Sequence, residues 1–246
     1  MTVSVEVVEP VLFAGVVADE IVASIAEAVG ERGACSIALA GGSTPGAIYR
    51  CLAKPPRVSE VEWSKVKLFW GDERWVPPTD NQSNFKMTQE TLLGQILGAG
   101  PRFFPVPTDV ATPADGAARY AETIRRELGA SPVFDLVILG VGEDGHTASI
   151  FPHAPVIHAS GSICAAVEHP EDKKARVTLT PEVLFGARRT IFIVKGEAKA
   201  EIMKRVLEGD DSVDTIPSKL YTRAEDRTTF FLDSGAAVRL SRSTVS

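Results

Sequence analysis

Short apolar runs alternate with amphipathic runs along most of this chain. Residues 3–8 alternate apolar and polar side chains with the period of two that is typical of a β-strand. Short apolar runs bounded by glycine, proline or charge predict buried strands at residues 36–40, 66–70, 134–139, 162–167, 190–194 and 229–232. Apolar side chains at helical spacing predict helices at residues 16–29, 45–52, 84–97, 114–128 and 198–207.

Two of these helices carry start signals. Either Ser83 or Asn84 is a suitable N-cap for the helix at 84–97, and Thr112 is suitable for the helix at 114–128, with Pro113 in its first turn. The alternation of strands and helices predicts an α/β fold, a doubly wound, mostly parallel, Rossmann-like sheet with helices on both faces. Because no internal repeat or linker-length tract interrupts this pattern, we expect a single domain over residues 1–246.

Composition and charge narrow the class of protein. The length of 246 residues, with 44% hydrophobic and 24% charged residues, is typical of a globular protein with a large core. A net charge of −6 argues against a nucleic-acid or anionic membrane surface, but it leaves room for a local cationic site. The N-terminus lacks a basic segment, and no apolar run approaches the roughly 18 residues of a membrane span. We therefore expect no nucleic-acid or membrane partner.

The cysteines and histidines give no sign of a disulfide framework or a metal. Cys35, Cys51 and Cys164 are odd in number and lack zinc-ligand spacing, which favours a reducing cytoplasm. His153, His158 and His169 have no metal-ligand spacing with a carboxylate or cysteine. We expect a cytoplasmic protein with no metal, present as a monomer or weak homo-oligomer.

Residues 138–152, ILGVGEDGHTASIFP, are the most informative segment of the chain. They predict the end of a buried strand, a glycine-rich turn and then His146, flanked by Gly145 and Thr147. Open α/β sheets bind ligands at the carboxyl ends of their strands, and an imidazole with an ordinary pKa of about 6.5 moves protons at neutral pH. The segment therefore favours a catalytic turn over a structural histidine.

The same turn also contains GxGxxG, followed downstream by Glu168, in outline a dinucleotide-binding fingerprint. Two features argue against that function. Pro152 and Pro155 interrupt the helix that should follow, and Glu143 and Asp144 place negative charge where a pyrophosphate would bind.

Residues 39–45, LAGGSTP, form a second candidate loop between a predicted strand and a predicted helix. Free backbone N–H groups, the helix dipole and two hydroxyls would favour an anion at Gly41, Gly42, Ser43 and Thr44. A plain strand-to-helix turn with a hydroxyl N-cap is the structural alternative. No lysine follows in Walker A spacing, so a nucleoside triphosphatase is not indicated.

A third candidate lies at residues 69–75, FWGDERW, after another predicted strand. Arg74 has the planar fork that suits an anionic oxygen, and Asp72 is suited to orienting a polar group. A solvated turn is the alternative. Arg176, near a strand start, and Lys199, in the first turn of a predicted helix, are further cations that would help to hold a phosphate.

Taken together, these segments resemble the 6-phosphogluconolactonase family. The resemblance rests on LAGGSTP (39–45), WGDERWV (70–76), NQSN (81–84), LGVGEDGHTASIFP (139–152), RVTLTP (176–181) and residues 196–199. It implies the fold shared with glucosamine-6-phosphate deaminases and hydrolysis of 6-phospho-D-glucono-1,5-lactone in the oxidative pentose phosphate pathway. It also implies that the enzyme uses no organic cofactor and that its partner is a phosphorylated sugar lactone.

The deaminase relatives differ at two places. Their turn resembles GxGxDGHxAFNEP, with a glutamate that assists ring opening, whereas this chain has no carboxylate between His146 and Pro152. Their DEY segment is replaced by Asp72-Glu73-Arg74. The chain departs from the usual lactonase sequence at Lys195, where a small hydroxyl residue is commoner, and at His153, where glycine is commoner.

The expected chemistry is lactone hydrolysis without a covalent intermediate. His146 takes a proton from the attacking water and returns it to the leaving ring oxygen. Either Asp144 or Asp72 orients the imidazole, and either the backbone N–H groups of residues 140–145 or Arg74 stabilises the oxyanion. The residues expected to hold the phosphate are Gly41, Gly42, Ser43, Thr44, Arg176 and Lys199. Arg74 is a candidate for either role, as a phosphate ligand or as the group that stabilises the oxyanion.

Two other classes of function were weighed. A serine hydrolase is disfavoured because the sequence has no GxSxG elbow. A non-catalytic sugar-phosphate sensor needs phosphate contacts but no proton shuttle, so the combination of His146, Asp144 and Arg74 favours an enzyme.

Overall fold

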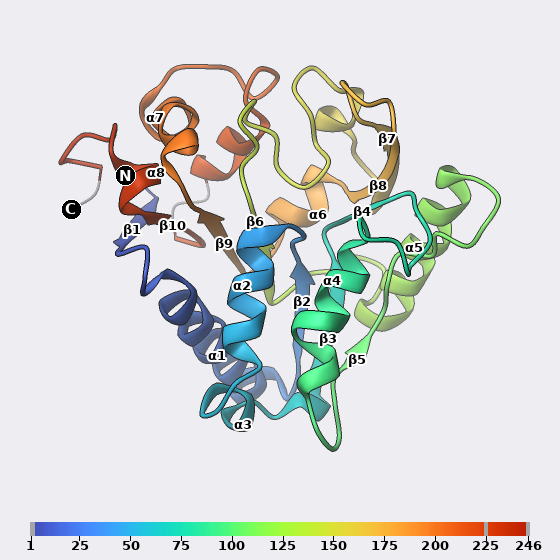
Figure 1. Cartoon of the computed structure of the whole chain (residues 1–246). Coiled ribbons are helices and arrows are strands. Elements are labelled where there is room, and N and C mark those ends of the chain that lie inside the picture. The colour runs from blue at the N-terminus through green and yellow to red at the C-terminus, as the bar shows by residue number, and fades with distance from the viewer. Residues whose placement is uncertain (1–2, 224–225, 245–246) are drawn as a thin grey trace.

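The main sheet of the protein is parallel throughout. The computed structural model describes residues 3–223 and 226–244. Within them, seven strands run in one direction (Figure 1). Their order across the sheet is β1 (Ser4–Val8), β10 (Thr228–Asp233), β9 (Arg189–Val194), β6 (Leu136–Leu139), β2 (Cys35–Leu39), β3 (Val66–Trp70) and β5 (Arg102–Phe103). The predicted α/β fold with a mostly parallel sheet is confirmed.

A second, smaller sheet is antiparallel. It consists of β4 (Asp72–Arg74), β8 (Ala175–Leu179) and β7 (Cys164–Glu168), in that order. The strand expected at 162–167 therefore exists, but it pairs in this sheet rather than in the parallel one. Because β4 is short and entirely charged, no apolar alternation in the sequence indicated a strand there.

The helices surround these sheets. Helix α1 (Phe13–Arg32) packs on α2 (Ser43–Leu52), and α2 packs on α4 (Asn84–Thr91), whereas α5 (Pro113–Leu128) contacts β7 and β8. The remaining α-helices are α3 (Arg57–Glu60), α6 (Pro181–Phe185), α7 (Ala200–Glu208) and α8 (Ser234–Ala237). Short 3₁₀ turns are η1 (Trp63–Lys65), η2 (Leu93–Gln95), η3 (Pro155–His158), η4 (Glu197–Lys199) and η5 (Pro217–Arg223). None of the helices in residues 3–223 and 226–244 is both long and apolar enough to cross a membrane.

The helices at 84 and 113 start at the predicted caps, whereas several other predicted bounds differ by one to three residues and the end predicted at residue 97 is wrong. The Ser83 hydroxyl accepts the N–H of Lys86, and the Thr112 hydroxyl accepts the N–H of Asp115, both at 3.1 Å. The helix predicted at 84–97 ends at Thr91 and gives way to η2. The apolar spacing continues through the 3₁₀ turn, and this continuation made the helix look longer than it is.

Two buried tyrosines hold the carboxyl ends of the central strands β2 and β3. The Tyr49 hydroxyl donates to the carbonyl of Ala40 at 3.0 Å and accepts its N–H at 3.1 Å. The Tyr120 hydroxyl binds Trp70 in the same way, donating to its carbonyl at 2.9 Å and accepting its N–H at 2.7 Å. Each hydroxyl thus satisfies a backbone donor and acceptor where the strand leaves the ladder.

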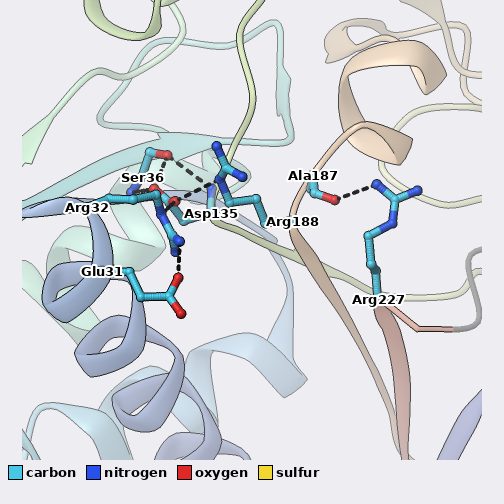
Figure 2. Close-up of polar contacts among 7 residues, drawn as sticks. All are labelled: Glu31, Arg32, Ser36, Asp135, Ala187, Arg188 and Arg227. Carbon is cyan, nitrogen blue, oxygen red and sulfur yellow. Dashed lines mark hydrogen bonds and ion pairs between the residues drawn. The ribbon is translucent and has the colours of Figure 1, made fainter.

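At the opposite edge of the sheet, the Asp135 carboxylate holds the amino ends of β2 and β6 (Figure 2). Asp135 accepts the N–H of Ser36 at 2.8 Å and its hydroxyl at 2.7 Å, and it pairs with Arg32 Nε at 2.7 Å. These contacts join the starts of β2 and β6 to the end of α1. Side chains therefore hold both ends of β2, the end of β3 and the start of β6, in addition to the backbone ladder.

We expect Tyr120→Phe to lower the free energy of unfolding by about 1–3 kcal/mol, because it leaves the buried N–H and carbonyl of Trp70 without partners. Urea unfolding measures this change. Tyr221→Phe is the matched control, since Tyr221 is equally buried and its hydroxyl has no partner among the described residues. That control should keep or raise stability, and equal losses in both variants would contradict the role given to Tyr120.

Candidate active site

A cleft of about 330 Å³ opens at the carboxyl edge of the parallel sheet, between the ends of β2, β3 and β6 and the small antiparallel sheet. Residues from all three candidate loops meet there. The predicted site residues that line the cleft are Gly41, Asp72, Arg74, His146, Arg176 and Lys199. Gly42 is the N-cap of α2, and Ser43 and Thr44 begin that helix directly behind Gly41.

His146 pairs with Asp144 of the same turn. The imidazole Nδ1 lies 2.6 Å from Asp144 Oδ1, which also accepts the backbone N–H of His146 at 3.1 Å. Burial opposes ionisation of Asp144, but the hydrogen bond and charge of His146 outweigh it, so the pKa of Asp144 lies below its usual range. The ionised carboxylate holds Nδ1 of a ring that lines the cleft, and Nε2 is the atom at the other side of that ring.

The glycines of this turn allow the pair to form. A Cβ on Gly142 would lie 2.1 Å from His146 Nδ1, so only glycine fits beneath the ring. The N–H of Gly142 donates to the carbonyl of His146 at 2.8 Å, and the N–H of Gly145 donates to the carbonyl of Gly142 at 3.0 Å. These two amides are used within the turn, which removes them from the set of oxyanion donors that the sequence offered.

Asp72 has different partners. It is buried, accepts the Ser149 hydroxyl at 2.6 Å and lies 3.3 Å from the Asn84 amide nitrogen. The side chain of Asn84 also occupies the space beside Gly41, where a Cβ would lie 1.8 Å from Asn84 Oδ1. Asp72 is therefore fixed in the wall of the cleft by Ser149 and Asn84, while Asp144 is the carboxylate on the histidine.

Arg74 and Arg176 are directly opposite each other on β4 and β8. Arg74 Nη1 donates to the carbonyl of Gln82 at 2.6 Å, and the Nε atoms of both arginines are buried without a partner among the described residues. Burial, followed by the charge of Arg74, lowers the pKa of Arg176. Two neighbouring guanidinium groups in a cleft that Lys199 also lines form a local field that favours an anion.

Glu73, between Asp72 and Arg74, points to the other face of β4. It accepts the backbone N–H groups of Asn84 at 2.7 Å and Phe85 at 2.8 Å and so caps α4. Burial raises the pKa of Glu73 despite these donors. The segment predicted as a loop with a solvated alternative is thus a strand whose alternate side chains face the cleft and a helix terminus.

Several cleft residues were given no role by the sequence. Phe151 packs between two imidazoles, with ring centroids 4.9 Å from His146 and 4.9 Å from His169. Asn84 and Phe151 fall inside recognisable segments, but His169 lies in none, and its place in the cleft is visible only from the fold. Across the described residues, no cluster of His, Cys, Asp or Glu side chains is arranged to hold a metal ion.

A parallel α/β sheet that carries a histidine–aspartate pair and two neighbouring arginines in a cleft at its carboxyl edge is an arrangement suited to an enzyme that acts on an anionic substrate. A family model described as "Glucosamine-6-phosphate isomerases/6-phosphogluconolactonase" matches residues 9–230. Because this match covers most of the chain, the protein belongs to that family.

Within the family, several similar proteins carry the name 6-phosphogluconolactonase. The protein from Synechocystis sp. is 32% identical over 88% of this chain and 89% of its own length. The one from Treponema pallidum is 36% identical over 76% of this chain and 77% of its own length. The structure of 6-phosphogluconolactonase from Trypanosoma brucei superposes with a TM-score of 0.84, at 30% identity, over 97% of this chain and 99% of that one. The predicted resemblance to this family of lactonases is confirmed.

We expect Arg176→Met to raise the free energy of unfolding of the empty protein, on the order of 1 kcal/mol, because it removes a half-buried cation beside Arg74. Inorganic phosphate should raise the Tm of the wild type and raise that of the variant less. Thermal and urea unfolding with and without phosphate measure both effects. Arg126→Met, at an exposed arginine on α5, should change neither quantity. A less stable Arg176→Met with an unchanged response to phosphate would contradict the anion site.

Proposed function

We propose that this protein hydrolyses 6-phospho-D-glucono-1,5-lactone to 6-phospho-D-gluconate, the lactonase step of the oxidative pentose phosphate pathway. The observation that carries the proposal is the His146–Asp144 pair at 2.6 Å in the same cleft as the Arg74–Arg176 pair. A base for water and a site for a phosphate are the two things this reaction requires. The family assignment and the lactonase relatives support the same activity.

His146 is the proton carrier in this proposal. With Nδ1–H donated to Asp144, Nε2 is the free basic atom, and it accepts a proton from a water that attacks the lactone carbonyl carbon. The tetrahedral intermediate then collapses, the bond between that carbon and the ring oxygen breaks, and the imidazolium returns the proton to the leaving oxygen. Asp144 stabilises the imidazolium between these two transfers.

The phosphate is held at the cationic side of the cleft. Arg74 and Arg176 face the same side of the small sheet, and Lys199 and Gly41 contribute to the same cleft lining. A phosphate dianion bound there relieves the repulsion between the two arginines and satisfies guanidinium donors that have no carboxylate partner within residues 3–223 and 226–244. Asp72, fixed by Ser149, is placed to accept a sugar hydroxyl.

We expect the wild type to accelerate loss of 6-phosphogluconolactone, generated in situ, above its spontaneous rate. His146→Ala should fold normally and lose about 10²–10⁴-fold in kcat, because the general base is gone. His158→Ala is the control, since His158 is exposed and pairs with Asp214 away from the cleft. Glucosamine 6-phosphate deamination is assayed in parallel. Binding of the phosphorylated sugar without turnover would instead support a sensor, and deamination would move the protein to the isomerase branch.

A second pair of variants separates the two aspartates. Asp144→Asn should lower kcat by about 10²–10⁴-fold with little change in KM, since it removes the carboxylate that holds the Nδ1 proton and stabilises the imidazolium. Glu143→Gln removes the same charge from the neighbouring exposed residue and should leave kcat within about twofold. Asp72→Asn should act chiefly on KM. If Asp72→Asn alone abolished kcat and Asp144→Asn did not, the assignment of Asp144 would be wrong.

A further inference from the structure

His169 is a second histidine of the cleft to which neither the family segments nor the proposed mechanism gives a role. It follows β7, in the hairpin that joins β7 to β8, and its side chain is 20% exposed. It lines the same cleft as His146, Arg74 and Arg176. This partly buried imidazole therefore lies where a ligand in the cleft could contact it.

The hairpin fixes which edge of the imidazole faces the cleft. The Nδ1 atom of His169 lies 3.3 Å from the backbone nitrogen of Asp172, 3.4 Å from that of Glu171 and 3.2 Å from the Asp172 carboxylate oxygen Oδ1. The ring also packs edge-on against Phe151, with an interplanar angle of 83°. With Nδ1 turned toward the hairpin, Nε2 lies on the opposite side of the imidazole. Nε2 carries a proton in the tautomer whose Nδ1 accepts the two amides, and also in the imidazolium whose Nδ1 pairs with Asp172. His169 therefore presents an N–H donor to the cleft.

Strand register places this donor on the same face as the two arginines. In the β7–β8 ladder Val167 is opposite Arg176, and the ladder continues with the N–H of His169 bonded to the carbonyl of Lys174 at 3.0 Å. Residues two apart on a strand share a face, so His169 lies on the face of Val167 and hence of Arg176. Arg176 is in turn opposite Arg74 on β4. One face of the small sheet thus carries three nitrogen donors in a row.

We propose that His169 is a third ligand of the substrate phosphate, donating from Nε2–H to a phosphate oxygen beside Arg74 and Arg176. This inference rests on the proposed function of the cleft, because it assigns a residue to the recognition of its phosphorylated substrate. The chemical class recognised is a phosphate monoester. His169 makes the site select phosphorylated lactones over their unphosphorylated counterparts.

A positioning role would have a different signature. His169 contacts Phe151, which in turn contacts His146, so the imidazole would also act by holding the catalytic ring through Phe151. Loss of such a role lowers kcat, because the base is misaligned. Loss of a phosphate ligand raises KM for the phosphorylated substrate and leaves kcat and the unphosphorylated substrate unaffected.

The test compares His169→Phe and His169→Gln with the wild type. Phenylalanine keeps a ring against Phe151 but removes the donor, so KM for 6-phosphogluconolactone should rise by about 10-fold with kcat within about twofold. Glutamine keeps a side-chain N–H and should recover part of the loss. Hydrolysis of unphosphorylated glucono-1,5-lactone should not change in either variant. His158→Phe, at the exposed histidine bound to Asp214, is the matched control and should behave as wild type.

Binding of 6-phosphogluconate, measured by calorimetry, separates this inference from the proposed activity. The inference predicts that His169→Phe weakens 6-phosphogluconate by about 10-fold and leaves gluconate unchanged, whether or not the wild type turns over the lactone. Equal binding by variant and wild type, absence of binding to the wild type, or a loss of kcat at constant KM would each overturn it. Wild-type binding that depends on His169 without lactone turnover would refute the proposed function alone.

Discussion

The common direction of the seven strands is the constraint on which the site depends. In a parallel sheet every carboxyl end meets the same edge, so loops far apart in the sequence converge there. The Gly41 loop, β4 and the His146 turn leave neighbouring strands β2, β3 and β6. Tyr49 and Tyr120 hold the ends of β2 and β3 by satisfying the backbone groups that the ladder no longer pairs. The cleft is therefore built on rigid strand ends.

The small antiparallel sheet supplies the charge. Its strands carry Arg74 and Arg176 opposite each other, although like charges at directly opposed positions are unfavourable. The repulsion and the burial that lower the pKa of Arg176 are costs in the empty protein. Proteins retain such unfavourable arrangements at binding sites, where the ligand compensates for them. An anion bound between the two guanidinium groups would offset their repulsion. An acidic chain with a net charge of −6 thereby acquires a local cationic site.

The alternation of side chains on β4 shows how one short segment serves two purposes. Asp72 and Arg74 face the cleft, and Glu73 faces the N-terminus of α4, whose N–H groups it accepts. Glu73 is held by the N–H groups of α4, just as Asp144 is held by His146. The charged triplet that resembled a solvated turn is a strand with each carboxylate and cation in a defined place.

Local pattern predicted most of the elements, because each buried strand needs an apolar run and each helix needs its own period and cap. Ser83 and Thr112 cap α4 and α5 as the sequence predicted. Gly142 is required by the side chain of His146 in the same turn, which is also a local constraint. The sequence could not predict the antiparallel sheet, since β4 lacks apolar residues and its pairing with β8 joins segments about a hundred residues apart. It offered Asp144 and Asp72 equally as partners of His146. The structure pairs His146 with Asp144 inside one turn, whereas the contact of Asp72 with Ser149 joins residues 77 positions apart and depends on the tertiary fold. Strand register, a property of the folded chain alone, placed His169 beside the arginines.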